Sequence, residues 1–177
     1  MNTTDSDSRQ WLYQGMKFKV ESLDYTVGPH SITKDIIRHP GAVVVLPWVD
    51  ESHICLVENY RVAVGKTLLE LPAGTCEPPE NPLQTARREL EEETGYQAGS
   101  WQLLHRFYPS PGILDEQMHL FVARQLTAGV PRREPGEQIQ NVILAWSEVL
   151  RRLDEGRIQD AKTLVGILLF ERWRSRL

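Results

Sequence analysis

One segment, Gly74 to Tyr96, constrains this chain more than any other part of the sequence. It reads GTCEPPENPLQTARRELEEETGY. Pro82 stands where a helix starts, because its missing N–H costs nothing there. Gly95 stands where a left-handed residue ends a helix. Apolar residues recur between them at helical spacing, which gives one apolar stripe. The segment therefore predicts a loop followed by a helix over 82–94.

Three glutamates of this helix, Glu89, Glu92 and Glu93, follow the spacing i, i+3, i+4. Side chains at these positions meet on one face of a helix. Crowded carboxylates repel one another unless a cation lies between them, and a cluster of hard oxygen ligands suits Mg²⁺ or Mn²⁺. Runs of glutamate are also common on solvated helix faces. The run alone therefore leaves both interpretations open.

The whole segment matches the signature of the Nudix hydrolases. That signature is Gly, five residues, Glu, seven residues, then Arg-Glu-apolar-any-Glu-Glu-any-Gly-apolar. The last position departs mildly, because it holds Tyr96 rather than an aliphatic residue. Seven identities at fixed spacing arise by chance on the order of 10⁻⁸ per start position. The chain thus resembles a Nudix hydrolase over most of its length. The matching residues are Gly74, Glu80, Arg88, Glu89, Leu90, Glu92, Glu93 and Gly95.

The resemblance implies a fold and a metal site. The fold class is α+β, a Nudix-type α/β/α sandwich with a mixed sheet and an N-terminal antiparallel strand extension. Arg88 would hold the glutamates in place, and Glu80 would be an outer partner. Glu92 and Glu93 are expected to be essential for catalysis, because they would hold Mg²⁺ (or Mn²⁺) against the substrate. The implied metal ligands are Glu89, Glu92, Glu93 and the backbone carbonyl of Ala73.

Three segments outside this signature resemble the ADP-ribose pyrophosphatase subgroup. They are residues 58–74, the turn around Pro111 sixteen residues after Gly95, and residues 156–169. The resemblance implies metal-dependent hydrolysis of ADP-ribose to AMP and ribose 5-phosphate. It also implies that Arg61, Glu70 and Pro111 bind the substrate. Without the resemblance, Arg61 could equally be a surface arginine that stabilises the hairpin. Pro111 could simply be part of a turn that joins two strands.

The loop at 131–140 is expected to carry the catalytic base. Glu137 aligns best with that role and Glu134 is second, although a solvated loop acid is an equal alternative. An aromatic residue of the N-terminal strands often stacks on adenine in this subgroup. Trp11, Tyr13 and Phe18 are candidates, but each is as well explained by packing.

The pattern along the chain indicates many strands before and after the central helix. Residues 42–49 are continuously apolar and suit a strand buried on both faces, with 53–60 as its hairpin partner. Ser147 is expected to cap a helix, and a last helix covers 160–174. The expected strands cover 11–27, 31–39, 42–49, 53–60, 67–71, 101–108, 117–125 and 139–146.

We expect three parts: a disordered leader over 1–10, N-terminal strands over 11–40, and a Nudix hydrolase domain over 41–177. In the subgroup such N-terminal strands are commonly exchanged in a homodimer, so a homodimer is favoured here. An exposed strand edge needs cover in any case.

Composition excludes several classes of partner. Lys and Arg number 20 against 24 Asp and Glu, a net charge of −4, which argues against nucleic acid. No apolar stretch is long enough for a membrane span. Cys55 and Cys76 form no CxxC pair and are expected to be reduced thiols in a cytoplasmic protein.

Two alternatives to the ADP-ribose prediction stay open. The first is a Nudix hydrolase of another nucleoside diphosphate compound, such as GDP-mannose or NADH. The second is a non-catalytic ADP-ribose-binding module, which the intact glutamates disfavour. An acidic-face interaction protein with an accidental signature is weaker still.

Overall fold

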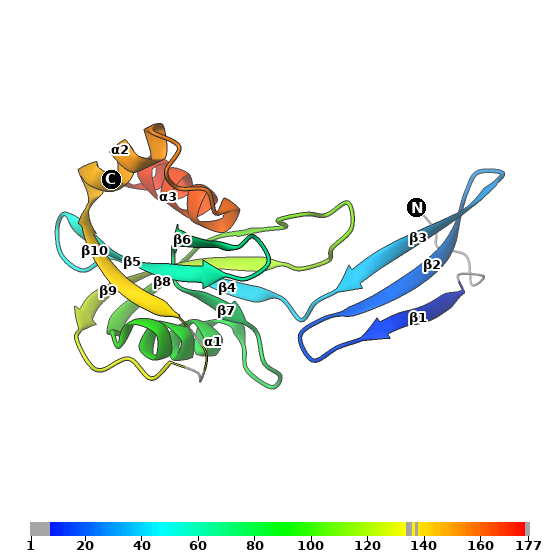
Figure 1. Cartoon of the computed structure of the whole chain (residues 1–177), viewed down its shortest axis with the longest axis horizontal. Coiled ribbons are helices and arrows are strands. Elements are labelled where there is room, and N and C mark those ends of the chain that lie inside the picture. Colours follow the sequence, from blue (N-terminus) through cyan, green and yellow to red (C-terminus); the bar gives the residue numbers. More distant parts are fainter. Residues whose placement is uncertain (1–7, 134–135, 137, 176–177) are drawn as a thin grey trace.

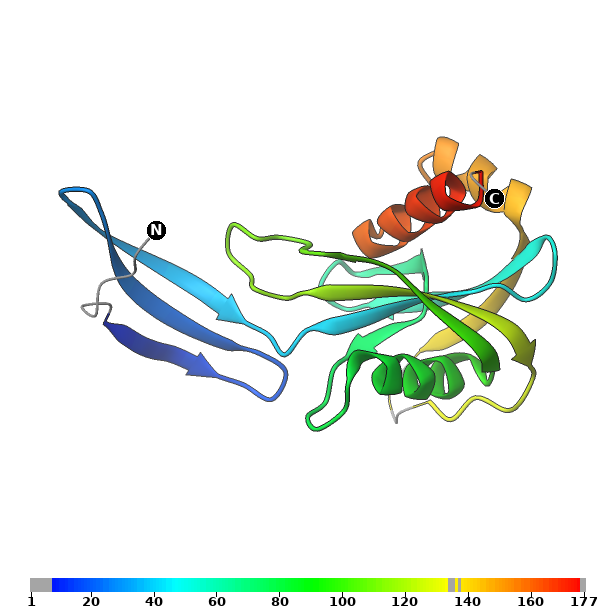
Figure 2. The ribbon, with the colours of Figure 1, turned by 180° about the vertical axis from the view of Figure 1, so that it is seen from behind.

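The computed structural model describes residues 8–133, 136 and 138–175. Helices lie on opposite sides of a layer of strands, and a separate sheet extends from one end (Figures 1 and 2). This arrangement confirms the α+β class and the N-terminal strand extension. The strands are β1 (Arg9–Gln14), β2 (Lys19–Val27), β3 (His30–Arg38), β4 (Ala42–Pro47), β5 (His53–Arg61), β6 (Lys66–Glu70), β7 (Ala73–Thr75), β8 (Gln97–Phe107), β9 (Met118–Thr127) and β10 (Ile139–Ala145). The helices are α1 (Pro82–Glu89), the π-helix η1 (Leu90–Thr94), α2 (Trp146–Asp154) and α3 (Ala161–Arg174).

Strand β4 runs through the centre of the molecule and is buried along its whole length. It pairs parallel with β9 and antiparallel with β7, so its four-stranded sheet, in the order β7-β4-β9-β8, is mixed. Val43 and Val45 pack against Ala86 and Leu90 of the α1–η1 helix. The alternate residues of β4 pack in a second cluster with α2 and α3. Both faces of β4 are therefore core, as its continuous apolar run predicts.

The expected hairpin between β4 and β5 is wrong. Strand β5 pairs with β10 on one side and β6 on the other, in a second, antiparallel sheet. Only an isolated bridge, Trp48 to Ile54, joins the chain after β4 to β5. A β-branched apolar run predicts a buried strand, but it does not specify which strand lies beside it.

The N-terminal sheet has the order β1-β2-β3 and lies beside the core rather than in it (Figure 1). The single strand expected over 11–27 is two strands, joined by a turn at residues 15–18. Arg9 and Gln10 belong to β1, so the expected disordered leader is wrong for them. Residues 1–7 of that leader lie outside the described residues.

Contacts near the end of β3 attach this sheet to the core. Ile37 forms a parallel bridge with Leu114, and Arg38 donates to both Glu21 and Asp115. Glu21 is 1% exposed, so it needs this cation as a partner. The position of the sheet beside the core thus depends on the backbone bridge of Ile37 and on the pair of Arg38 with Asp115.

The two C-terminal helices begin differently. α3 has Asp160 as its N-cap, with the carboxylate accepting from the Thr163 amide, as expected. α2 begins one residue earlier than expected, at Trp146, with Ala145 at the N-cap and no side-chain cap. The expected cap at Ser147 is therefore wrong, because the helix already includes Trp146, whose side chain is buried. Within the described residues, no helix is long and apolar enough to cross a membrane.

Candidate active site

The glutamate-bearing helix is fixed at both ends by local chemistry. Asn81 accepts hydrogen bonds from the amides of the first turn, and the Gln84 side chain accepts from the Asn81 amide, which completes a capping box. After Glu89 the helix widens into the π-helical turn of η1, and Gly95 ends it with a φ of +79°. The helix expected over 82–94 is present, with a last turn that is π rather than α. Such turns are frequent at functional sites.

Two glycines of the signature are required by close contacts. A Cβ at Gly74 would lie 1.9 Å from the carboxyl carbon of Glu89. A Cβ at Gly95 would lie 2.7 Å from the carbonyl oxygen of Gly129, in addition to the strain of a positive φ. Gly74 thus lets the Glu89 carboxylate lie against the backbone of β7, and Gly95 lets the loop before residue 131 pack on the helix end.

Arg88 joins three glutamates of the signature. Its Nη1 donates to Glu89 Oε1 at 2.8 Å and to Glu92 Oε2 at 3.0 Å. Its Nε lies 3.1 Å from Glu80 Oε1, and its Nη2 donates to the Thr75 carbonyl at 3.3 Å. The structure therefore places Arg88 among the glutamates and Glu80 beside it, as the signature implies.

This arrangement shifts the pKa values of its members. Burial opposes the charged form of Arg88, but hydrogen bonds to Glu80 and the nearby Glu89 and Glu92 carboxylates outweigh it and raise the pKa of Arg88. The hydrogen bond from Arg88 lowers the pKa of Glu80. Arg88 is therefore a permanent cation, and Glu80 stays ionised near neutral pH.

Glu93 of the same helix contacts the backbone of β7. It is 5% exposed, and its Oε2 accepts from the backbone amide of Ala73 at 3.2 Å. This contact ties the end of the helix to β7, a strand twenty residues earlier. It also brings Ala73 next to the glutamates, although the two are far apart in the sequence.

These groups line one cavity of about 410 Å³. Its wall includes Glu89, Glu92 and Glu93 from the helix, Ala73 and Gly74 from β7, and the turn between β1 and β2. Arg61 and Asn59 at the end of β5 also line it. Four separate parts of the chain thus meet around a carboxylate-rich hollow, and concave sites of this kind are where ligands bind.

The donor set fits a divalent cation. Three carboxylates and a backbone segment line the same hollow, and Arg88 is bonded to Glu80, Glu89 and Glu92. Oxygen-rich, net-negative surroundings are what Mg²⁺ and Mn²⁺ require. Among the described residues, no three acidic, His or Cys side chains already form a ligand set. Arg88 bridges Glu89 and Glu92, so a cation would replace part of this bridge.

Arg61 and Glu70 form a second ionic group at the edge of the cavity. Arg61 Nε and Nη2 donate to the two oxygens of Glu70 at 2.8 and 2.6 Å, a bidentate pair. The hydrogen bonds that Arg61 donates to Glu70 raise the pKa of Arg61. Arg61 lines the cavity, whereas Glu70 is 1% exposed and lies behind it. Glu70 therefore contacts Arg61 rather than the open space.

One expected site residue, Pro111, is not brought to this cavity. Pro111 lines a separate hollow of about 330 Å³ between the N-terminal sheet and the loop before β9, together with Arg38 and Tyr108. Glu137 and the second base candidate, Glu134, lie outside the described residues. The substrate role of Pro111 and the base role of Glu137 stay predictions.

Sequence reasoning missed Lys162 and Asn59. Lys162 is nearly buried and donates to Glu70 Oε2 at 2.5 Å across 92 residues of sequence. Nothing local marks a lysine in a helix as a partner for a distant strand. Asn59 precedes Arg61 by two residues on β5, so the alternation of strand side chains could have placed both on one face.

The two cysteines are poor nucleophiles. Both are free and buried. Burial raises the pKa of Cys55 to about 12 and also raises the pKa of Cys76, although Cys76 lines the cavity. A thiolate is the reactive form, so neither thiol is suited to covalent catalysis near neutral pH.

Known proteins share this signature and fold. The model of the NUDIX domain matches residues 38–164. The chain is 39% identical over 157 residues to the methanol dehydrogenase activator of Bacillus methanolicus, covering 86% of this chain and 83% of that protein. It is 38% identical over 150 residues to the ADP-ribose pyrophosphatase of Bacillus subtilis (strain 168), covering 84% of this chain and 80% of that protein.

A crystal structure of an ADP compounds hydrolase has the same fold. It superposes with a TM-score of 0.80 over 98% of this chain and 96% of that chain, at 20% identity. The matched family model, the sequence relatives and the glutamate-lined cavity agree. The chain belongs to the Nudix hydrolase family.

Proposed function

We propose that this protein hydrolyses the diphosphate of ADP-ribose to AMP and ribose 5-phosphate. The observation that carries the proposal is the cavity that Arg61 lines together with Glu89, Glu92 and Glu93. It offers a carboxylate-rich wall for a divalent cation and a guanidinium for a phosphate oxygen. The similarity to the ADP-ribose pyrophosphatase of Bacillus subtilis supports this choice among nucleoside diphosphate compounds.

We propose Mg²⁺ (or Mn²⁺) as the cofactor, with Glu89, Glu92, Glu93 and the Ala73 carbonyl as its ligands. When bound, such a cation neutralises the negative charge that develops on the diphosphate oxygens. Arg88 keeps Glu89 and Glu92 on one side of the cavity, and the contact of Glu93 with the Ala73 amide keeps that carboxylate beside β7. These contacts support the ligand assignment.

The reaction then needs one water and one base. The water oxygen attacks a phosphorus of the diphosphate, and the bond from that phosphorus to the bridging oxygen breaks. One product gains the hydroxyl oxygen, and the other keeps the bridging oxygen. We assign removal of the water proton to Glu137, with Glu134 as the second candidate, from the loop that follows β9. Arg132 and Arg133 attach the described part of this loop to the glutamate helix, which supports its place at the site.

A product panel tests the substrate. The purified chain with Mg²⁺ is incubated separately with ADP-ribose, GDP-mannose and NADH, and the products are separated by chromatography. AMP and ribose 5-phosphate should form from ADP-ribose in the wild type and not in Glu92→Gln. Cleavage of another compound while ADP-ribose survives would overturn the substrate. Binding of ADP-ribose without any product would instead indicate a binding module.

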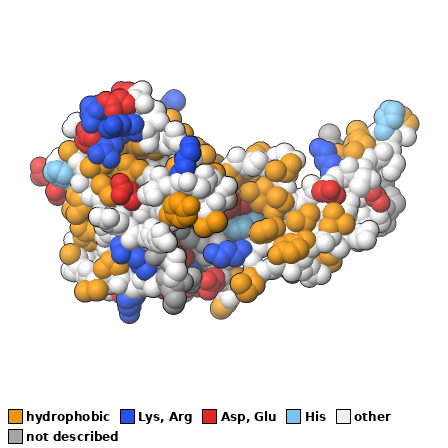
Figure 3. Space-filling view, viewed as in Figure 1, with side chains coloured by type: hydrophobic (Ala, Val, Ile, Leu, Met, Phe, Trp, Pro, Cys, Tyr) orange, Lys and Arg blue, Asp and Glu red, His pale blue; other side chains and the backbone are white. Residues whose placement is uncertain are grey.

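We also propose that the chain forms a homodimer through its N-terminal sheet. Hydrophobic side chains are exposed on that sheet beside the core (Figure 3). Such side chains and a free strand edge need cover. The exposed residues include Trp11, Leu12, Tyr13 and Phe18.

Light scattering should give twice the mass of one chain for the wild type. The double variant Trp11→Glu, Phe18→Glu should give the mass of one chain. A wild-type monomer would overturn the proposed dimer.

The two free, buried cysteines support a cytoplasmic location, where thiols stay reduced.

A further inference from the structure

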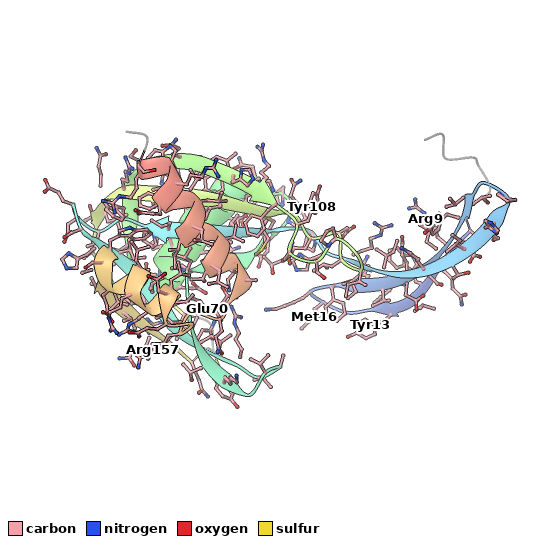
Figure 4. All side chains as sticks on the ribbon, turned by 90° about the horizontal axis from the view of Figure 1, so that it is seen from above. Arg9, Tyr13, Met16, Glu70, Tyr108 and Arg157 are labelled. Carbon is pink, nitrogen blue, oxygen red and sulfur yellow. The ribbon has the colours of Figure 1, made fainter. Side chains whose placement is uncertain are left out.

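Lys162 is a buried cation that the proposed reaction does not use. It lies in the first turn of α3, within the segment 156–169, and its side chain is 10% exposed. A lysine is seldom buried unless its ammonium is paired. Lys162 Nζ lies 2.5 Å from Glu70 Oε2 and 2.9 Å from Asp160 Oδ2. Figure 4 shows Glu70 beside the N-terminal end of α3.

Glu70 is held from two sides. Arg61 contacts it from the cavity, and Lys162 contacts the same oxygen, Oε2, from α3. A carboxylate that is 1% exposed is expensive to bury, and two cations offset that cost better than one. The Glu70 side chain, at the end of β6, is therefore fixed in place.

A second contact joins the same two segments. The Thr163 hydroxyl accepts from the Leu71 amide at 2.8 Å, and it donates to Asp160 Oδ2 at 2.6 Å. Gly166, one turn later, lets Leu71 pack directly on α3, because a Cβ there would lie 2.5 Å from the Leu71 side chain. The start of α3 is thus built to hold the backbone and side chains of residues 70–71.

Arg61 is the member of this group that reaches the cavity. Its side chain is 43% exposed, and it lines the same hollow as the glutamates. An arginine with that much exposure has many rotamers, and a bidentate carboxylate removes most of them. The orientation of Arg61 therefore depends on how firmly Glu70 is held.

We propose that Lys162 is a positioning residue for substrate binding: it holds Glu70 from behind, so that Glu70 presents the Arg61 guanidinium to the anionic substrate. This inference rests on the proposed function, because it takes the ligand of the cavity to be a nucleoside diphosphate. Lys162 does not contact the substrate and acts only through Glu70 and Arg61.

The decisive variant is Lys162→Met, which keeps the length and apolar stem of the side chain and removes its charge. Its KM for ADP-ribose should rise about tenfold while kcat stays within about threefold, because the loss falls on binding. If this variant does not fold, Lys162→Gln serves in its place with the same expected rise. An unchanged KM in the folded variant would overturn the inference.

A double-mutant cycle separates positioning from general destabilisation. In an Arg61→Gln background, Lys162→Met should change KM by less than about twofold, because the residue through which Lys162 acts is already gone. The matched control is Ile167→Ala, which removes a fully buried side chain of α3 without touching the charges. It should lower the thermal midpoint and leave KM unchanged. An equal rise in both backgrounds, or a rise in the control, contradicts the inference.

Binding of ADP-ribose without added metal, measured by calorimetry, distinguishes the two proposals. A wild type that binds ADP-ribose in this measurement but forms no product once Mg²⁺ is added contradicts the proposed function alone. A Lys162→Met variant that binds as tightly as the wild type contradicts the positioning role alone. A wild type that neither binds nor hydrolyses it contradicts both.

Discussion

Two ionic clusters flank the same cavity and differ in charge balance. The first, called the box cluster, comprises the signature residues Arg88, Glu80, Glu89, Glu92 and Glu93. The second, called the Lys162 cluster, comprises Arg61, Glu70, Asp160 and Lys162. The box cluster has one guanidinium for four carboxylates, and the Arg88 side chain is 24% exposed. The Lys162 cluster has two cations for two carboxylates, and Glu70 at its centre is 1% exposed.

The difference follows from the cost of burying charge. A balanced cluster tolerates burial, because each charge has a partner and few groups are left to water. An unbalanced cluster retains repulsion that only a further cation removes. The box cluster is thus suited to bind a cation, whereas the Lys162 cluster is suited to hold its neighbours still. The following changes test that division.

The largest effect is expected from neutralising the box cluster. Glu92→Gln should lower kcat with ADP-ribose and Mg²⁺ by about two orders of magnitude or more, because one ligand of the cation is lost. Glu93→Gln should behave in the same way. Glu155→Gln is the matched control, since Glu155 is a glutamate at the end of α2 that pairs with Arg151. Turnover near that of the wild type in both variants would refute the metal assignment, as long as circular dichroism shows an intact fold.

A smaller effect is expected from displacing one ligand without changing its charge. In Gly74→Ala the new Cβ would overlap the Glu89 carboxylate and push it away from β7. The affinity for Mn²⁺, measured by calorimetry, should fall about tenfold to a hundredfold. Gly112→Ala is the control, because nothing lies within 4 Å of a Cβ built there. Equal affinity in the two variants would show that Glu89 is not a ligand.

The charge imbalance should also appear as stabilisation by metal. At about one hundred times its dissociation constant, Mg²⁺ should add about 2.7 kcal/mol to the free energy of unfolding, because it binds the folded chain only. The thermal midpoint of the wild type should rise by about 5–10 °C. Glu92→Gln should lose most of this rise, whereas Lys162→Met should keep it. Loss of the rise in Lys162→Met would mean that the two clusters are not separate.

The smallest effect is expected at a solvated group on α2. Arg151 and then Arg152 lower the pKa of Glu148 to about 2. A lowered pKa in the folded chain stabilises it above the ordinary value of 4.5, and that gain is lost as the pH falls toward 2. Thermal midpoints of the wild type and Glu148→Gln should therefore differ slightly at pH 7 and converge toward pH 3. A difference that widens on acidification would contradict this sign.

The box cluster is the part of the site that the sequence predicts best. Helical spacing places Glu89 and Glu92 on one face. The family resemblance implies that Arg88 holds them, and the structure has both contacts. The Nudix signature adds Glu80 as the partner of Arg88, and the structure has that contact. All these contacts span eight residues or fewer, so local geometry decides them.

The Lys162 cluster is the part that the sequence could not predict. Its members come from β5, β6 and the start of α3, and the contact of Lys162 with Glu70 spans 92 residues. A lysine in a helix usually extends into solvent, so the residues around Lys162 in the sequence do not indicate that its side chain is buried. The sequence also did not predict the pairing of β5 with β10 rather than β4, because an apolar strand does not specify which strand lies beside it.

By itself, the sequence determined the glutamate helix with its opening proline and closing glycine, the buried character of β4, and the family. Each of these depends on residues close together in the chain, whose spacing and conformational preferences act in any context. Only the tertiary structure decided which strands pair, that Pro111 lies outside the glutamate-lined cavity, and that Lys162 lies behind Glu70. Those outcomes depend on which distant surfaces bury each other, a choice made by the packing of the whole chain.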